Sequence, residues 1–198
     1  MKTAFIIGNG ETRRGFDLTR LKPYGTIFGC NALYRDYYPE FEVPDYLVAI
    51  DDGIIGEIEQ QQDFPSQRVI FPPADERWEP AECNRARPRS NAGINAMREA
   101  IKMGYNQLIC LGFDFLVQDA EYNTSNMYDG TKNYGPNTRA NAADNPGRYN
   151  YLNWLVCNNP EVDFIFIFPE VLTKGKIYGN ISGSNVYVNS YENLEIHT

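Results

Sequence analysis

Short runs of apolar residues recur along the chain, and each ends at a glycine, asparagine, aspartate or proline. The runs lie within residues 2–7, 26–30, 46–50, 68–71, 107–111 and 164–168. None shows the alternation of polar and apolar residues that is typical of a strand with one face in water. We therefore expect strands that are buried on both faces, as in a parallel sheet.

Segments with helical spacing separate these runs. They cover residues 11–21, 54–62, 90–104 and 149–157. The third is the clearest, because Ile94, Met97 and Ile101 share one helical face, Ser90 or Asn91 can cap its start, and Gly104 can end it. Strands that alternate with helices predict an α/β fold, here a Rossmann-like three-layer α/β/α arrangement with a mainly parallel sheet.

The other segments predict the connections and the domain limits. Residues 117–149 are rich in asparagine, glycine and tyrosine and lack apolar periodicity, which favours a long lid-like loop. The alternating residues 186–191 indicate a C-terminal hairpin or arm within 179–198. We therefore expect one Rossmann-like domain over residues 1–178, followed by that small appendage.

Net charge narrows the classes of partner. The 198 residues carry a formal charge of −8, the wrong sign for holding nucleic acid by phosphate neutralisation. No apolar run approaches the length of a membrane span or a signal peptide core, and the cysteines show no C-x-x-C pairing. We expect a cytoplasmic protein with reduced thiols and neither a nucleic acid partner nor a membrane span.

Histidine chemistry is disfavoured because the sole histidine, His197, is the penultimate residue. A histidine-based zinc site, a Ser-His-Asp triad and a Cys-His pair each need an internal histidine. We expect no metal site of this kind and no cofactor.

Polar residues follow several of the predicted strands. Gly8, Asn9 and Gly10 follow the first strand, Asn31 the second and Asp114 a later one. The carboxyl ends of parallel strands face one crevice, where such folds bind ligands. The backbone N–H groups of the glycine turn can meet a phosphate or ribose, although the dinucleotide fingerprint G-x-G-x-x-G is incomplete because position 13 is arginine. A tight turn between strand and helix is the simpler interpretation.

The pair Asp51 and Asp52 has two interpretations. Carboxylates after a strand can hold Mg²⁺ together with substrate phosphates. They can also cap the next helix, and we favour that role for Asp52 while leaving both open for Asp51.

The order of these motifs resembles that of the bacterial single-domain sialyltransferases. That family carries G-N-G-P-S, R-C-N-x-F-Y, S-G before an alanine-rich helix, and G-I-D-F. Here the matching segments are residues 8–13, 29–34, 90–93 and 112–115. A second resemblance is to archaeal-type 6-hydroxymethylpterin diphosphokinases and flagellin-modification proteins, which share P-D-x-x-x-x-x-D with residues 44–51.

The first resemblance implies a metal-independent glycosyltransferase that binds a CMP-type nucleotide-sugar donor and an acceptor of unknown identity, and that forms a homo-oligomer. It implies nucleotide contacts from Asn9 and Asn31, a donor site lined by 8–12, by Ser90, Asn91 and Gly93, and by Asp114, and a tyrosine on the leaving phosphate. The implied nucleotide-binding residues are Gly8, Asn9, Gly10, Thr12, Asn31, Ser90, Asn91, Gly93, Asp114 and Tyr122.

The chain departs from the family at the catalytic base, because residues 133–149 contain no histidine. Proton removal then falls to Asp144, Asp51 or Asp129, since burial can raise a carboxyl pKa toward neutrality. Glu11 replaces the proline of the first motif, with Arg13 and Arg14 beside it as solvated surface or as its counter-charges. The alternatives are a Mg-ATP-dependent diphosphokinase relative and a non-catalytic nucleotide-binding module.

Overall fold

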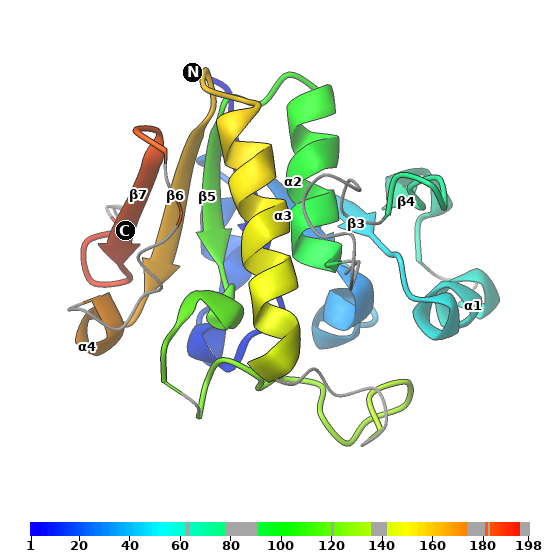
Figure 1. The fold of residues 1–198 in the computed structure, drawn as a ribbon. Coiled ribbons are helices and arrows are strands. Elements are labelled where there is room, and N and C mark those ends of the chain that lie inside the picture. Colours follow the sequence, from blue (N-terminus) through cyan, green and yellow to red (C-terminus); the bar gives the residue numbers. More distant parts are fainter. Residues whose placement is uncertain are drawn as a thin grey trace.

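The computed structural model describes residues 1–61, 64–77, 91–119, 121–135, 142–173, 181 and 183–194. Within these ranges every strand belongs to one sheet (Figure 1). The strands are β1 (Thr3–Ile7), β2 (Thr26–Cys30), β3 (Tyr46–Val48), β4 (Val69–Ile70), β5 (Gln107–Leu111), β6 (Asp163–Phe168) and β7 (Val186–Ser190).

The strands run in the order β4-β3-β2-β1-β5-β6-β7, and every pair is parallel. The chain moves outward from β1 to β4, returns to the other side of β1 as β5, and then continues to β7. This reversal beside β1 is the topological switch point of a doubly wound sheet. The predicted Rossmann-like α/β fold is therefore confirmed.

One face of the sheet is covered by two helices, α2 (Ala92–Lys102) and α3 (Asn145–Cys157) (Figure 1). Asn91 caps α2 by accepting a hydrogen bond from the Ile94 N–H at 3.0 Å, and Gly104 follows the helix with a left-handed φ of +80°. The apolar residues of α2 pack with those of β1, β2 and β5 in one core cluster. The cap and the stop signal thus lie where the sequence indicates.

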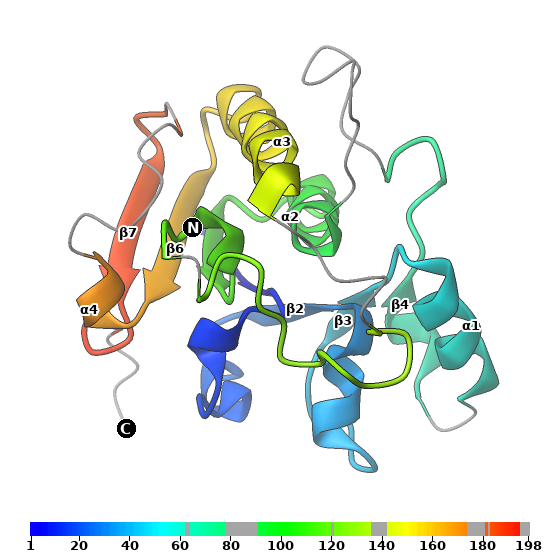
Figure 2. The ribbon, with the colours of Figure 1, turned by 60° about the horizontal axis from the view of Figure 1, so that its bottom comes forward.

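The opposite face is covered mainly by 3₁₀ turns and by part of the loop after β5 (Figure 2). The helix expected over residues 11–21 is wrong: the chain forms η1 (Glu11–Arg13) and η2 (Leu18–Leu21) instead. Gly15 between them has a φ of +83°, which breaks the helical path. A longer turn, η3 (Asn31–Tyr37), follows β2.

Other element limits differ by a few residues from the expected ones. Helix α1 covers Asp52–Gln60, and the last long helix begins at Asn145, four residues before the expected start. The loop after β5 therefore ends earlier than residue 149. In this loop, the described residues 117–119 and 121–135 form no helix and no paired strand longer than a single bridge residue, and the 3₁₀ turn η6 (Ala142–Asp144) leads into α3.

Of the expected C-terminal hairpin or arm, the hairpin is wrong for residues 186–190. β7 pairs in parallel with β6 over five residue pairs from Phe164 and Val186 to Phe168 and Ser190. The short helix α4 (Glu170–Thr173) begins the connection that returns the chain to the end of the sheet where the strands start. β7 therefore adds a parallel strand beside β6 instead of folding back on it. None of the helices described is both long and apolar enough to cross a membrane.

Candidate functional site

A cavity of about 250 Å³ lies at the carboxyl ends of β1, β2, β3 and β5. Residues 121–135, which we call the lid, run across these strand ends from η5 (Asp114–Leu116) toward β3 and α1 (Figure 2). The helices α2 and α3 both begin at this end of the sheet (Figure 1). The described lining residues are Gly8, Asn9, Gly10, Cys30, Asn31, Ile50, Asp51, Asn91, Ala92, Gly93, Gly112, Phe113, Asp114, Phe115, Asn123, Thr124, Ser125, Asn126, Asp129, Tyr134 and Arg148.

The glycine turn after β1 is joined to the turn after β5. The N–H of Gly8 donates to the Leu111 carbonyl at 2.8 Å, and that of Gly10 to the Gly112 carbonyl at 3.0 Å. A Cβ atom at Gly10 would lie 2.3 Å from Cγ of Asp114, so glycine is needed for the close approach. These two N–H groups are therefore not available for a phosphate, contrary to the expectation from the sequence.

Asp114 and Thr12 hold this junction together. The Thr12 N–H donates to Oδ2 of Asp114 at 2.8 Å, and the Thr12 hydroxyl bonds to Oδ1. Asp114 is only 3% exposed, and burial raises the pKa of its carboxyl to about 6 although both Thr12 bonds oppose the rise. Thr12 itself is absent from the described cavity lining, so its evident role is to hold Asp114.

Arg13 is a buried residue of the frame and not solvated surface. It is 3% exposed, and its Nε donates to the Gly8 carbonyl at 2.7 Å. Its guanidinium also donates to the Tyr128 hydroxyl at 3.1 Å and lies 3.5 Å from the Asp36 carboxylate. The Tyr128 hydroxyl in turn donates to Asp36 at 2.8 Å, so this buried group attaches the lid to the body of the protein. Arg14, by contrast, pairs with Glu11 at the surface, as one of the two expectations had it.

A second group of polar side chains fixes the far end of the lid. Arg35 pairs with Glu57 on α1, with an N–O distance of 2.6 Å, and also donates to the Thr131 hydroxyl and the Lys132 carbonyl, each at 3.0 Å. The Asn133 amide donates to Glu57 at 2.9 Å. The lid is thus held against the strand ends by residues from η3 and α1.

Asn9 lies between the lid and β2. Its side-chain Nδ2 donates to the Cys30 carbonyl at 3.2 Å, and its backbone carbonyl accepts the Met127 N–H at 2.9 Å. The Cys30 carbonyl can only accept a hydrogen bond, so the NH₂ end of the Asn9 side chain must face it. The side-chain oxygen Oδ1 is then left as an acceptor. This Oδ1 is buried and has no hydrogen-bond donor among the residues that the structure describes.

The end of β2 is joined to the end of β3 through Asn31 and Asp51. The Asn31 amide donates to Oδ2 of Asp51 at 2.5 Å, and its oxygen accepts the Ile50 N–H at 3.3 Å. Water reaches the Asp51 side chain, yet the surrounding protein limits its hydration, and this raises the pKa of the carboxyl against the lowering effect of the Asn31 amide. The cap role expected for Asp52 is wrong, since Asp51 occupies the N-cap position and Asp52 is the first helical residue.

The helical layer contributes the positive side of the cavity. Asn91, Ala92 and Gly93 form the start of α2, where the first N–H groups have no intrahelical acceptor and the helix dipole favours an anion. Arg148, on the first turns of α3, is the one lysine or arginine among the described lining residues, and it donates to Oδ1 of Asn145 at 2.9 Å. Arg148 was not among the expected site residues, because it stands one residue before the expected start of this helix.

The structure brings most of the expected residues together, with Thr12 and three further residues as exceptions. Tyr122 packs against the core cluster that includes residues of α2 and α3 and is not among the described lining residues, whereas Tyr134 is. Asp144 precedes α3 without lining the cavity in the described part of the chain, while Asp129 does line it. Ser90 lies outside the described residues.

Two other groups bear on the chemistry of the cavity. Burial raises the pKa of the Cys30 thiol to about 12, and this thiol donates to the Ile7 carbonyl at 3.1 Å, so it stays protonated. Burial likewise raises the pKa of Tyr134, which remains a hydroxyl donor at neutral pH. Among the described residues, no three His, Cys, Asp or Glu side chains group in a way that could hold a metal ion.

Comparison of the chain with protein family models, with curated proteins and with solved structures finds no match.

Proposed function

We propose that this protein is a glycosyltransferase that binds a CMP-type nucleotide-sugar in the cavity and transfers the sugar to a hydroxyl acceptor without a metal ion. The observation that carries the proposal is the convergence of four separate segments on one cavity beneath a lid. They are the ends of β1, β2 and β5 and the start of α2, and these are the segments in which the resemblance to sialyltransferases resides.

The polar character of the lining favours a ligand of low charge. Five of the described lining residues are asparagines, and neutral amides suit the hydroxyls of a sugar and the edges of a base. Among the described lining residues, one arginine and one helix start offer positive charge, while Asp51, Asp114 and Asp129 are carboxyls. This balance suits the single charge of a phosphodiester better than the several charges of a triphosphate.

Asp51 is the residue to which we assign the general base. It lines the cavity, and its raised pKa makes it a better proton acceptor than an ordinary surface aspartate. Asp144 does not share this position, so it is set aside as the base. Asp114 also lines the cavity, but both of its carboxyl oxygens are bonded to Thr12. Asp129 is a further carboxyl of the lining and serves as the internal comparison in the experiment below.

In the proposed transfer step, the residues of the cavity account for the proton that is released and for the charge on the leaving group. The acceptor oxygen bonds to the anomeric carbon as the bond from that carbon to the phosphate oxygen breaks. The acceptor proton passes to Asp51, and the electron pair leaves on the nucleotide phosphate beside Arg148 and the start of α2. A positive group placed where charge develops lowers the barrier most effectively in a cavity from which water is partly excluded.

One observation favours a second function. Asp51 and Asp129 line the same cavity, and Mg²⁺ is commonly held by one or two carboxylates together with substrate phosphates. A Mg-ATP-dependent diphosphotransferase would use this pair. The two functions differ in the ligand that should stabilise the protein and in its need for Mg²⁺.

Thermal unfolding against CMP, CMP-sialic acid, UDP- and GDP-sugars, and ATP with and without Mg²⁺ tests both functions. A ligand at 100 times its Kd adds about 2.7 kcal/mol to the free energy of unfolding, which for a chain of this length raises Tm by about 5–10 °C. We expect the CMP compounds to act in the presence of EDTA. Stabilisation by ATP with Mg²⁺ alone would support the second function, and no shift with any compound would refute both.

Donor turnover then tests the assignment of the base. We expect Asp51→Asn to lower the rate of sugar transfer about 10²–10⁴-fold, the usual contribution of a general base, and to leave CMP binding intact. Asp52→Asn is the matched control, because it makes the same change at the next position, outside the described lining. Equal rates for the two variants, or a larger loss in Asp129→Asn, would overturn the assignment.

A further inference from the structure

Asp51 stands in a position where aspartate usually has a structural task. It is the N-cap residue of α1, with extended backbone angles, and an N-cap carboxylate usually accepts an N–H from the first helical turn. Asp51 makes no such bond; its side chain is turned to Asn31 and the cavity instead. The helix therefore forgoes the capping stabilisation that this residue type could supply.

Asn31 is the residue that holds Asp51 in this orientation. It is 6% exposed and has a φ of +49°, in the left-handed region that residues other than glycine seldom adopt. This conformation directs its amide from the end of β2 toward the end of β3. Buried residues with such backbone angles cluster at functional sites, where the surrounding structure maintains them.

Both ends of the Asn31 amide are engaged by β3 and the residue that follows it. The Ile50 N–H requires an acceptor, so Oδ1 faces it, and Nδ2 consequently faces the carboxylate of Asp51. The resemblance assigns this asparagine to the nucleotide. The hydrogen bonds within the protein assign it to Asp51, with only Oδ2 of the carboxylate engaged by it.

We propose that Asn31 is a positioning residue, whose amide holds the Asp51 carboxylate toward the acceptor hydroxyl and which does not bind the donor nucleotide. This inference rests on the proposed function, in which Asp51 is the base. It assigns a separate role to each part of the site. The end of β2 orients the base, and the start of α2 together with Arg148 binds the phosphate.

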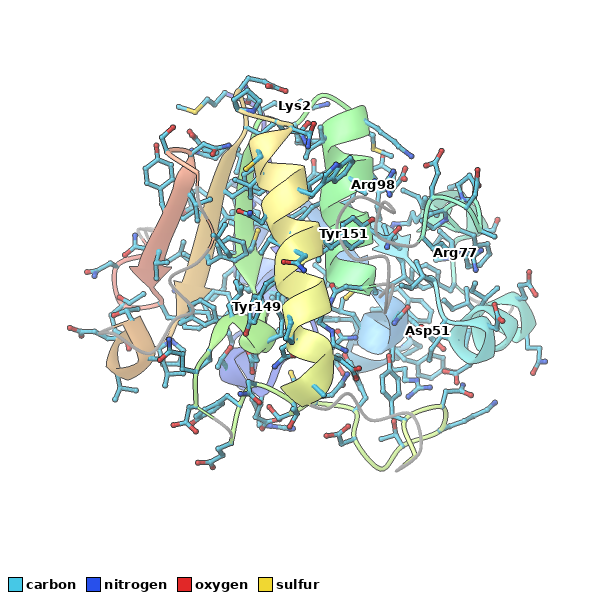
Figure 3. The ribbon with its side chains drawn as sticks, viewed as in Figure 1. Lys2, Asp51, Arg77, Arg98, Tyr149 and Tyr151 are labelled. Carbon is cyan, nitrogen blue, oxygen red and sulfur yellow. The ribbon has the colours of Figure 1, made fainter. Side chains whose placement is uncertain are left out.

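The other charged and titratable groups around Asp51 come from several elements. Asp52 on α1 raises the pKa of Asp51 by like-charge repulsion, and Arg77 lowers it. Arg77 is anchored beside it through hydrogen bonds to the Ile50 carbonyl at 3.2 Å and the Pro72 carbonyl at 2.7 Å, on the side of the sheet where α1 and β4 lie (Figure 3). The charge of Asp51 helps to raise the pKa of Tyr134 in the lid and of Cys30 in β2, and both groups remain protonated. Asp129 lines the same cavity.

The test uses Asn31→Gly, because glycine accepts the left-handed backbone and removes only the amide. We expect the kcat of sugar transfer to fall about 10–100-fold while the donor KM changes by less than twofold. We also expect the acidic limb of the pH–kcat profile to move to higher pH, since the lost bond favoured the ionised carboxyl. Asp52→Asn is the opposing control: it should move the same limb to lower pH, because it removes a like charge.

A donor KM or CMP Kd that rises tenfold with little change in kcat would overturn the inference and return Asn31 to the nucleotide. A second variant, Asn31→Asp, keeps an acceptor for the Ile50 N–H but has no N–H for Asp51, and it should reproduce the loss of kcat if Asn31→Gly does not fold.

A titration followed by NMR separates this inference from the proposed function. The ¹³C signal of the Asp51 carboxyl, identified by its absence in Asp51→Asn, should titrate at higher pH in Asn31→Gly than in the wild type. If no donor is turned over, the proposed function fails, yet this titration still decides whether Asn31 governs Asp51. An unchanged titration would show that it does not.

Discussion

The buried carboxyl of Asp114 makes the stability of this protein depend on pH in a way that one substitution can isolate. Burial raises its pKa to about 6, whereas the ordinary value of an aspartate is 3.8. The folded protein therefore binds this proton more tightly than the unfolded chain. Stability from Asp114 is complete below pH 3.8 and is lost as the pH rises through 6. Asp114→Asn should remove this dependence, because an amide can accept the Thr12 N–H and donate to the Thr12 hydroxyl.

The size of the effect follows from the two pKa values of Asp114. They differ by about 2.2, and each whole unit of pKa is worth about 1.36 kcal/mol, which gives about 3 kcal/mol between low and neutral pH. The carboxyl is 3% exposed, so solvent screening removes little of it. About 1.4 kcal/mol of the total falls between pH 5 and pH 7.5, a range that stays above the sequence pI of 4.7.

Urea unfolding of the wild type and of Asp114→Asn at pH 5 and pH 7.5 measures this difference directly. Other carboxyls titrate in both proteins, so their contributions cancel in the comparison. We expect the stability of the variant relative to the wild type to increase by about 1.4 kcal/mol from the lower to the higher pH. A relative stability that stays constant to within about 0.5 kcal/mol would refute the assigned burial and its cause.

Two further predictions concern the frame of the cavity. Gly10→Ala should destabilise the protein by about 1–3 kcal/mol, because its Cβ would meet Asp114, whereas Gly56→Ala in the open interior of α1 should stabilise it by about 0.5–1 kcal/mol; urea unfolding measures both. Glu57→Gln should weaken the attachment of the lid and cost about 1–3 kcal/mol, with faster amide exchange in residues 127–134. Glu59→Gln, exposed on the same helix, should change stability by less than about 0.5 kcal/mol, and equal exchange in the two variants would contradict the role of Glu57.

The central strands could be predicted because their signal is local. Residues 108–111 form an uninterrupted apolar run with a glycine after it, and β5 covers Gln107–Leu111. The 3₁₀ turns could not be predicted in the same way. Residues 11–21 have helix-like spacing, but the path is set by Arg13, whose partners Asp36 and Tyr128 lie far along the chain. The alternation in 186–190 likewise indicates a strand without indicating that its partner is the parallel strand β6.

The location of the candidate site could also be predicted, since the ends of parallel strands meet at one edge. The partner of each side chain could not. Asn31 finds Asp51 twenty positions later because β3 lies beside β2, and no local pattern states that the amide and the carboxyl will meet. Tyr134 was missed for a related reason: the course of the lid decides which of its residues reach the cavity, and Asn, Gly and Tyr residues occur throughout it. Arg148 was missed because α3 begins four residues before the start that the sequence indicates.

The division of polar groups in the cavity limits the ligands it can hold. Around the glycine turn, the hydrogen-bonding groups of Thr12, Arg13 and Asp114 are used within the protein, so this motif contributes shape more than ligand contacts. The remaining charge comes from two layers on opposite faces of the sheet. Asp51 belongs to the layer of η3, α1 and the lid, and Arg148 to the layer of α2 and α3. A ligand that binds to both Asp51 and Arg148 must place an anionic group toward the helices α2 and α3 and a proton donor toward α1. A nucleotide-sugar with its hydroxyl acceptor has this polarity, because the phosphate departs from one side of the anomeric carbon while the hydroxyl arrives from the other.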